Sequence, residues 1–176
     1  MKIEEAQKNY YEKNPKSVFF KNHQKIECAK FVTQNCYLEG MIQNTIMILP
    51  NTNIIFYDYV QFKQYANESV YSILYERLYN LMNTILGSYS SIDLHINLKS
   101  FSVSACHRHY QFIVQTLTEN QTQINKTNKL VIYHTPKFMD TISKLLHSTV
   151  KGFQCEVVYL REDSETKIEE LFNPNK

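Results

Sequence analysis

The chain has 176 residues, of which 43% are hydrophobic, so it is long enough to build one domain with a substantial core. The formal net charge is only +2, which excludes a strong overall field that would attract nucleic acid or an anionic membrane. No apolar run approaches the roughly 20 residues of a membrane span, and the charged N-terminus lacks a signal-peptide core, so we expect a soluble, cytoplasmic protein without a transmembrane segment.

The first 20 residues are polar and rich in aromatic side chains. We expect residues 1–20 to form an arm outside a single α/β domain of residues 21–176. Aromatic side chains give a large contact area, so this arm is typical of a segment that docks on a partner. Its aromatic residues include Tyr10, Tyr11, Phe19 and Phe20. The imperfect helical spacing of apolar residues over 25–38 predicts a helix after the arm.

A β-hairpin and a long helix are predicted next. The apolar segments 45–49 and 53–57 are separated by a short polar break that contains Pro50, which is typical of a hairpin turn. The helix that follows has a wide apolar stripe. Asn67 is suited to cap its start, and Gly87 is suited to end it, because glycine adopts left-handed backbone geometry at low cost.

From residue 92 to residue 160 the pattern predicts strand, helix, strand, helix, strand. Apolar and polar residues alternate over the first strand, as in a half-buried strand. The three predicted strands are 92–98, 129–134 and 155–160. Ser102 or Ser104 can cap the first helix, and Thr135-Pro136 would begin the second. A last helix would start at Ser164.

This order predicts an α/β fold with a mixed, mostly parallel five-stranded sheet, crossover helices, and an N-terminal hairpin and helix. A parallel strand covered on both faces should be apolar throughout. Asp93, His95 and Asn97 instead place polar side chains on one face of the expected central strand. That face would meet solvent, line a wet pocket or be covered by a partner, and we expect the helices mostly on the other side.

Few residues suggest chemistry. In the stretch 106–109 (Cys-His-Arg-His) the two histidines point to different sides of a helix, so we expect a solvated helix start and no metal. A cysteine at a helix start can have a lowered pKa, which makes a reactive Cys106 the alternative. No Gly-x-Ser-x-Gly elbow occurs, and Asp93 with His95 is typical of a structural polar pair, so we expect no enzymatic activity.

Two strand ends carry a resemblance to a known family. Asn97-Leu98-Lys99-Ser100-Phe101-Ser102 is similar to the Asp-Leu-Lys-Gly-Phe-Ser strand of the CRAL-TRIO (Sec14-like) lipid-binding domain, with Asn97 for the usual Asp and Ser100 for the usual Gly. Residues 129–138 resemble the family's apolar strand followed by proline and an aromatic residue. The resemblance covers about residues 53–172 and implies a gate helix at 139–150. No position matches the family's phosphoinositide head-group residues.

The same order of elements also resembles a STAS domain, in which a hairpin precedes alternating helices and strands. The helix after the 92–98 strand opens with Ser104-Ala105-Cys106-His107, where that family has Asp-Ser-Ser-Gly. The family's phosphorylatable serine has no matching position here. Both resemblances imply one broad architecture.

These observations predict a non-catalytic Sec14-like or STAS-like binding module that holds a protein partner or belongs to a larger assembly. The abundance of Asn, Ile, Lys and Tyr fits an AT-rich genome, as in many large DNA viruses, so a virus particle is one such assembly. One alternative is a lipid-binding or lipid-transfer protein with a bound lipid beneath helix 139–150. The pocket would be lined by Phe138, Met139, Ile142, Leu145, Leu146 and Val150. Another is a STAS-like switch phosphorylated near Ser102 or Ser104.

Overall fold

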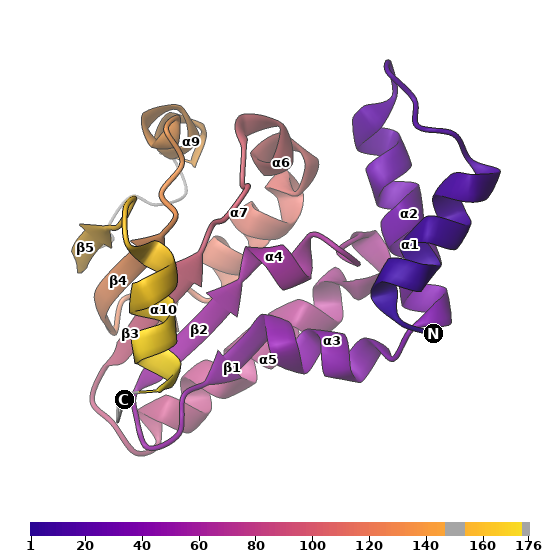
Figure 1. Cartoon of the computed structure of the whole chain (residues 1–176). Helices are drawn as coiled ribbons and strands as arrows, with labels where there is room; N and C mark the ends of the chain where they lie inside the picture. The colour runs from indigo at the N-terminus through magenta and orange to yellow at the C-terminus, as the bar shows by residue number, and fades with distance from the viewer. Residues whose placement is uncertain (147–153, 174–176) are drawn as a thin grey trace.

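A five-stranded sheet with the strand order β1-β2-β3-β4-β5 runs through the molecule (Figure 1). This computed structural model describes residues 1–146 and 154–173. The strands are β1 (Ile46–Ile48), β2 (Ile54–Asp58), β3 (Ile92–Asn97), β4 (Thr127–Tyr133) and β5 (Glu156–Tyr159). β1 pairs with β2 antiparallel and the other neighbours pair parallel. The predicted α/β fold with a mixed, mostly parallel sheet is therefore confirmed.

Helices precede, connect and follow the strands. Those before the β1–β2 hairpin are α1 (Ile3–Lys13), α2 (Lys21–Asn35) and α3 (Leu38–Thr45), and α4 (Tyr59–Phe62) directly follows β2. The crossovers contain the 3₁₀ turn η1 (Glu68–Val70), α5 (Tyr71–Leu86), α6 (Val103–Arg108), α7 (Tyr110–Glu119), α8 (Gln121–Ile124) and α9 (Met139–Leu146). The chain described here closes with α10 (Ser164–Phe172).

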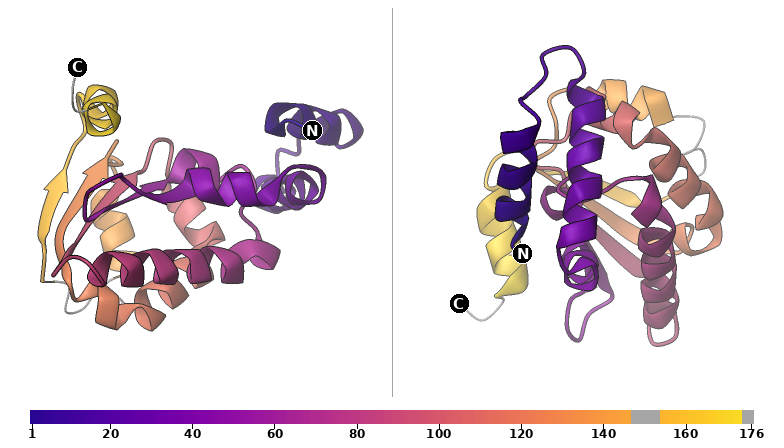
Figure 2. Two further views of the ribbon diagram at one scale, coloured as in Figure 1. Left: turned by 90° about the horizontal axis from the view of Figure 1, so that it is seen from below. Right: turned by 90° about the vertical axis from the view of Figure 1, so that its right-hand side faces the viewer.

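The crossover helices lie on one face of the sheet. Each parallel strand is the neighbour of the strand before it, so every right-handed crossover steps in the same direction and places its helix on the same side. Figure 2 shows α5, α7 and α9 on that side and α10 on the other. This agrees with the expectation of helices mostly on one face.

The main core lies between these helices and the sheet. Its largest fully buried side chains include Tyr65, Phe62, Ile55, Leu74 and Ile92. The Tyr65 hydroxyl donates to Thr45 Oγ1 over 2.8 Å, so the one polar group of that ring is satisfied. Burial of this apolar area is the main stabilising term of the fold.

A second, smaller core explains the polar face of β3. Leu49, Phe56, Val131 and Tyr133 are buried there, and Ile168 and Leu171 of α10 pack against them. His95 lies in register between Phe56 and Val131. The face that was expected to meet solvent, a wet pocket or a partner is thus covered in part by the chain's own last helix.

The predicted N-terminal arm contains a helix. α1 packs on α2, and Ala6 is fully buried in the main core. The two helices form a hairpin that projects from the body of the molecule (Figures 1 and 2). Residues 14–20 connect them and form what we name the hairpin tip.

Some predicted helix ends differ from the structure. Gly87 follows α5, but its φ of −71° is right-handed, so the conformational freedom of glycine is not used. Asn67 accepts a bond from Ser69 N and caps η1, which leads into α5. α9 starts at Met139, and Thr135 Oγ1 donates to the carbonyl of Ile132 instead of capping a helix. Ser102 caps α6 by accepting from Ala105 N, as predicted.

Candidate functional site

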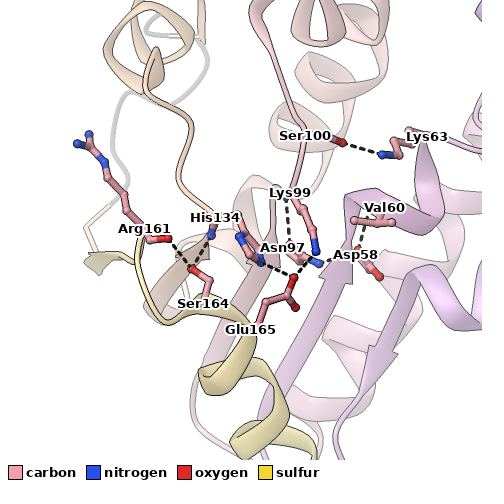
Figure 3. A network of polar contacts seen from close by, with 10 residues as sticks. All are labelled: Asp58, Val60, Lys63, Asn97, Lys99, Ser100, His134, Arg161, Ser164 and Glu165. Carbon is pink, nitrogen blue, oxygen red and sulfur yellow. Dashed lines mark hydrogen bonds and ion pairs between the residues drawn. The ribbon is translucent and has the colours of Figure 1, made fainter.

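The carboxyl edge of the parallel strands is the place where α/β sheets usually bind ligands. Figure 3 shows the polar side chains that meet there from β2, the β3 and β4 ends and α10. Asp58 accepts from Val60 N at 2.8 Å, and Asn97 Nδ2 donates to the same carboxylate at 3.1 Å. Asn97 Oδ1 accepts from Lys99 N at 3.1 Å. Burial raises the pKa of the Asp58 carboxyl despite these bonds.

A second group of contacts joins the β3 and β4 ends to α10. Lys99 Nζ pairs with the Glu165 carboxylate, and His134 Nε2 lies 3.5 Å from the same carboxylate. The bond from Lys99 lowers the pKa of Glu165. Ser164 Oγ accepts from His134 N at 2.9 Å. The chain is therefore fastened to the start of α10 just beyond β4 (Figure 3).

Three residues beyond the strand ends adopt left-handed backbone geometry. The φ angles are 66° at Ser100, 49° at His134 and 57° at Asp163. Such a conformation costs a non-glycine residue about 1–3 kcal/mol. Ser100 stands where the CRAL-TRIO pattern has glycine, and its positive φ gives a physical reason for a glycine at that position.

At the carboxyl edge, the polar side chains join neighbouring elements of the chain to one another and are not free to bind a ligand. Its carboxylates, amides and lysine are hydrogen-bonded or ion-paired mainly with one another. The strand order also does not reverse among β2 to β5, and a reversal is what opens a ligand crevice in a doubly wound sheet.

Ser164→Ala tests the contact between the β4 end and α10. The substitution removes the acceptor of His134 N, so we expect the free energy of unfolding to fall by about 1–2 kcal/mol. Urea unfolding followed by circular dichroism measures the loss. Glu170→Ala on an exposed part of α10 is the control, and an equal, near-zero effect of both changes would contradict the structural role of the Ser164 hydroxyl.

The predicted Asp93–His95 pair is not hydrogen-bonded. His95 Nδ1 instead lies 2.8 Å from the Tyr133 hydroxyl, and Asp93 accepts from Asn128 Nδ2 at 3.3 Å. Burial lowers the pKa of His95 to about 4, although the Asp93 charge opposes this shift. His95 is thus a neutral, buried imidazole beneath α10 at pH 7.

The stretch 106–109 also differs from its prediction. Cys106 is fully buried and His109 is 2% exposed, whereas Ser104 and His107 are exposed, so the expectation of a solvated helix start is only partly correct. Burial raises the pKa of the Cys106 thiol, which overturns the alternative of a lowered pKa. Within residues 1–146 and 154–173, no three His, Cys, Asp or Glu side chains are grouped to hold a metal ion.

Arg108 and His109 form a network that the sequence pattern did not reveal. Arg108 Nε donates to His109 Nε2 at 3.1 Å, so His109 carries its proton on Nδ1 and donates to the Tyr71 oxygen at 2.8 Å. Burial, followed by the Arg108 charge, lowers the pKa of His109 to about 3. The other Arg108 nitrogens donate to Asn22 Oδ1 at 3.1 Å and to the Tyr59 hydroxyl at 3.3 Å.

This network fastens the hairpin to the body, because Asn22 lies at the start of α2 and also accepts from Ser104 Oγ at 3.0 Å. A pocket of about 320 Å³ lies beside it. The pocket is lined by Ile26, Glu68, Tyr71, His107, Arg108, His109, Tyr110 and Gln111. Its wall carries both a negative and a positive side chain, Glu68 and Arg108, so its charge does not favour one class of ligand.

The hairpin tip exposes three consecutive apolar side chains. Val18, Phe19 and Phe20 are 72%, 90% and 71% exposed. Hydrogen bonds hold the tip in shape: Gln24 accepts from Ser17 N at 2.8 Å and donates to the carbonyl of Pro15 at 2.9 Å, while Ser17 Oγ accepts from Phe20 N at 3.0 Å. The apolar side chains are thus presented on an ordered turn.

Three positive side chains lie near enough to Lys25 to act on its charge, and we name the four together the cationic group. They are Lys21, Lys25, Lys63 and Arg108. Partial burial, followed by the positive charges of the other three, lowers the pKa of Lys25. In the part of the chain that the structure describes, no carboxylate lies within ion-pairing distance of any of them.

The residues of the predicted lipid pocket lie on and around α9. Ile142 is buried, Met139, Leu145 and Leu146 are half-buried, and Phe138 is 63% exposed. Val150 lies outside the described residues. Neither the 320 Å³ pocket nor a second pocket beside α3 and α5 is lined by these residues. The lipid pocket stays a prediction.

Comparison with known proteins gives no relative. No protein-family model matches the chain, and neither the curated proteins nor the solved structures contain a match. The CRAL-TRIO and STAS resemblances therefore stay predictions. Among the described residues, no helix has both the length and the apolar character that crossing a membrane requires.

Proposed function

We propose that the chain is a non-catalytic binding module of a larger assembly and that the hairpin tip is its contact surface. The observation that carries this proposal is the exposure of Val18, Phe19 and Phe20 at the end of a projecting helical hairpin. Contiguous exposed apolar side chains are unfavourable in water and mark interaction sites.

The way in which the hairpin is held supports the proposal. Ala6 of α1 is buried in the core, Tyr10 packs on Phe31 with ring centroids 5.9 Å apart, and Asn22 is bonded to Arg108 and Ser104. A contact surface that is already ordered loses little conformational entropy when it binds, so more of the contact energy appears as affinity.

The state of the carboxyl edge supports a non-catalytic role. The Asp58 carboxylate and the Lys99 ammonium are engaged with neighbouring groups of the same chain, and His95 and His109 have pKa values far below neutrality. A general base poised near pH 7 needs the opposite arrangement. The proposal keeps a Sec14-like or STAS-like origin, manufacture in the cytoplasm, and a virus particle as one such assembly.

The double variant Phe19→Ser/Phe20→Ser tests the contact surface. Burial of one phenylalanine contributes about 1.5–3 kcal/mol. We therefore expect at least a 10-fold loss in the amount of the native assembly that is recovered cross-linked to the protein. Cross-linking in the source cells or particles followed by quantitative mass spectrometry measures that amount.

Tyr37→Ser is the matched control, because Tyr37 is 71% exposed just beyond the other end of α2. The thermal midpoint should be unchanged in both variants, since neither site is buried. Retention of the assembly by the double variant at the level of the control would overturn the proposed contact surface.

A further inference from the structure

We infer that the hairpin tip attaches to an anionic lipid bilayer: Phe19 and Phe20 enter the boundary between head groups and acyl chains, and the cationic group meets the phosphates. This inference rests on the proposed function, because it takes the tip as the contact surface. It names the partner as a membrane surface in place of a protein.

The first argument is the chemistry of the tip. Three apolar side chains in sequence are flanked by Lys16 and Lys21. Peripheral membrane segments combine aromatic side chains, which bury about 5–10 Å into the interface, with lysines that stay at the head groups. The turn hydrogen bonds of Ser17 and Gln24 also satisfy backbone groups that would otherwise lose water on insertion.

The second argument is charge complementarity. Some lysines elsewhere on the molecule, such as Lys99, Lys129 and Lys167, have carboxylate partners within 4.0 Å. The cationic group has none among the described residues, and Lys63 donates only to the neutral Ser100 hydroxyl at 2.6 Å. Like charges gathered without counter-charges are stabilised by an external anion, and phosphate head groups supply it.

The third argument is placement. Figure 1 and the right-hand view of Figure 2 show the hairpin tip, α6 and α9 along the same upper edge of the molecule. The bonds of Arg108 and Ser104 to Asn22 fix the start of α2 beside α6. A flat surface can therefore contact the tip together with the exposed Lys21 and Lys25 at the start of α2, as docking on a bilayer requires.

The chain contains no tryptophan, so one introduced tryptophan reports on one site. In Phe19→Trp we expect the emission maximum to move to shorter wavelength when vesicles of phosphatidylcholine with phosphatidylserine are added. Vesicles of phosphatidylcholine alone should leave it unchanged. Tyr37→Trp is the control and should show no change with either vesicle, because its site lies at the far end of α2.

Neutralising charge tests the cationic group. Near an anionic surface each lysine contributes about a fivefold gain in partitioning, which equals about 1 kcal/mol. We therefore expect Lys21→Gln/Lys25→Gln to lower co-sedimentation with anionic vesicles about 25-fold. The control Lys126→Gln/Lys167→Gln, on other elements, should lower it less than twofold. Raising the salt concentration should weaken binding of the unsubstituted protein to anionic vesicles.

The outcomes separate this inference from the proposed function. Absence of an emission shift in Phe19→Trp, an equal shift with neutral vesicles, or an equal shift in Tyr37→Trp would each overturn bilayer docking. If bilayer docking is overturned but Phe19→Ser/Phe20→Ser still abolishes retention of the native assembly, the contact surface stands and its partner is a protein. If that variant retains the assembly, the proposed function itself fails.

Discussion

At pH 4 the protein is expected to be about 6 kcal/mol less stable than at pH 7, because two buried histidines are held neutral. His109 is 2% exposed and has a pKa of about 3, and His95 is 9% exposed and has a pKa of about 4. An unfolded histidine titrates near the ordinary pKa of 6.5. Each contributes about 3 kcal/mol to the difference, which is a large part of the stability of an ordinary domain.

The sign follows from proton counting. Between pH 6.5 and about 4 the unfolded chain binds protons at both histidines and the folded chain does not, so acid favours unfolding. The loss of stability is small above about pH 7 and grows as the pH falls through this window. The raised pKa of Asp58 acts in the opposite direction at the acid end and reduces the total.

Chemical denaturation at several pH values measures the effect. Between pH 6 and pH 5 we expect the free energy of unfolding to change by roughly 2–3 kcal/mol, which corresponds to slightly fewer than two protons. His95→Gln should reduce this change to about half, because one of the two protons is then absent. A slope near zero in the unchanged protein would contradict the assignment of both imidazoles as buried and neutral.

Phe62→Ala is expected to lower the free energy of unfolding by about 3–5 kcal/mol. The Phe62 ring is 2% exposed, stacks on Phe112 with centroids 5.3 Å apart, and meets the His109 imidazole edge at 4.9 Å. Its removal leaves a cavity that these rings fill only in part. The same cavity admits water to His109, so we also expect a smaller acid-induced loss of stability.

Urea unfolding at pH 7 measures the first effect. Ile73→Ala on α5 is the matched control, because Ile73 is 42% exposed and should lose less than about 1 kcal/mol. A loss below 1 kcal/mol for Phe62→Ala would show that the ring is not at the centre of the core.

Periodicity predicted the strands, but not the order in which they lie side by side in the sheet. It depends on burial, which each strand displays in its own residues. The alternation in β3 is an example: Ile92 is buried on the helix face, while Asp93 and His95 lie on the other. The sequence did not predict what covers that second face. The cover is α10, and its position depends on the turn after β5 rather than on any pattern in β3.

The network around Arg108 was missed for a related reason. One continuous helix was expected, but the chain bends at His109, where α6 ends and α7 begins. The bend turns the imidazole inward against Phe62, a contact between residues 47 positions apart in the sequence. Helical periodicity contains no information about such a break. The aromatic composition of residues 1–20 also did not indicate that Tyr10 packs inward on Phe31 while Phe19 is exposed.

The agreement between strand order and chain order also bears on how the molecule is made. Each strand that leaves the ribosome finds the edge of the preceding strand already available, so the sheet can grow from the N-terminal side during synthesis. α10 emerges after all five strands, and only then does the second core close over His95. A nascent chain halted before residue 164 is therefore expected to have a paired sheet with one uncovered face, which is a natural binding site for a chaperone.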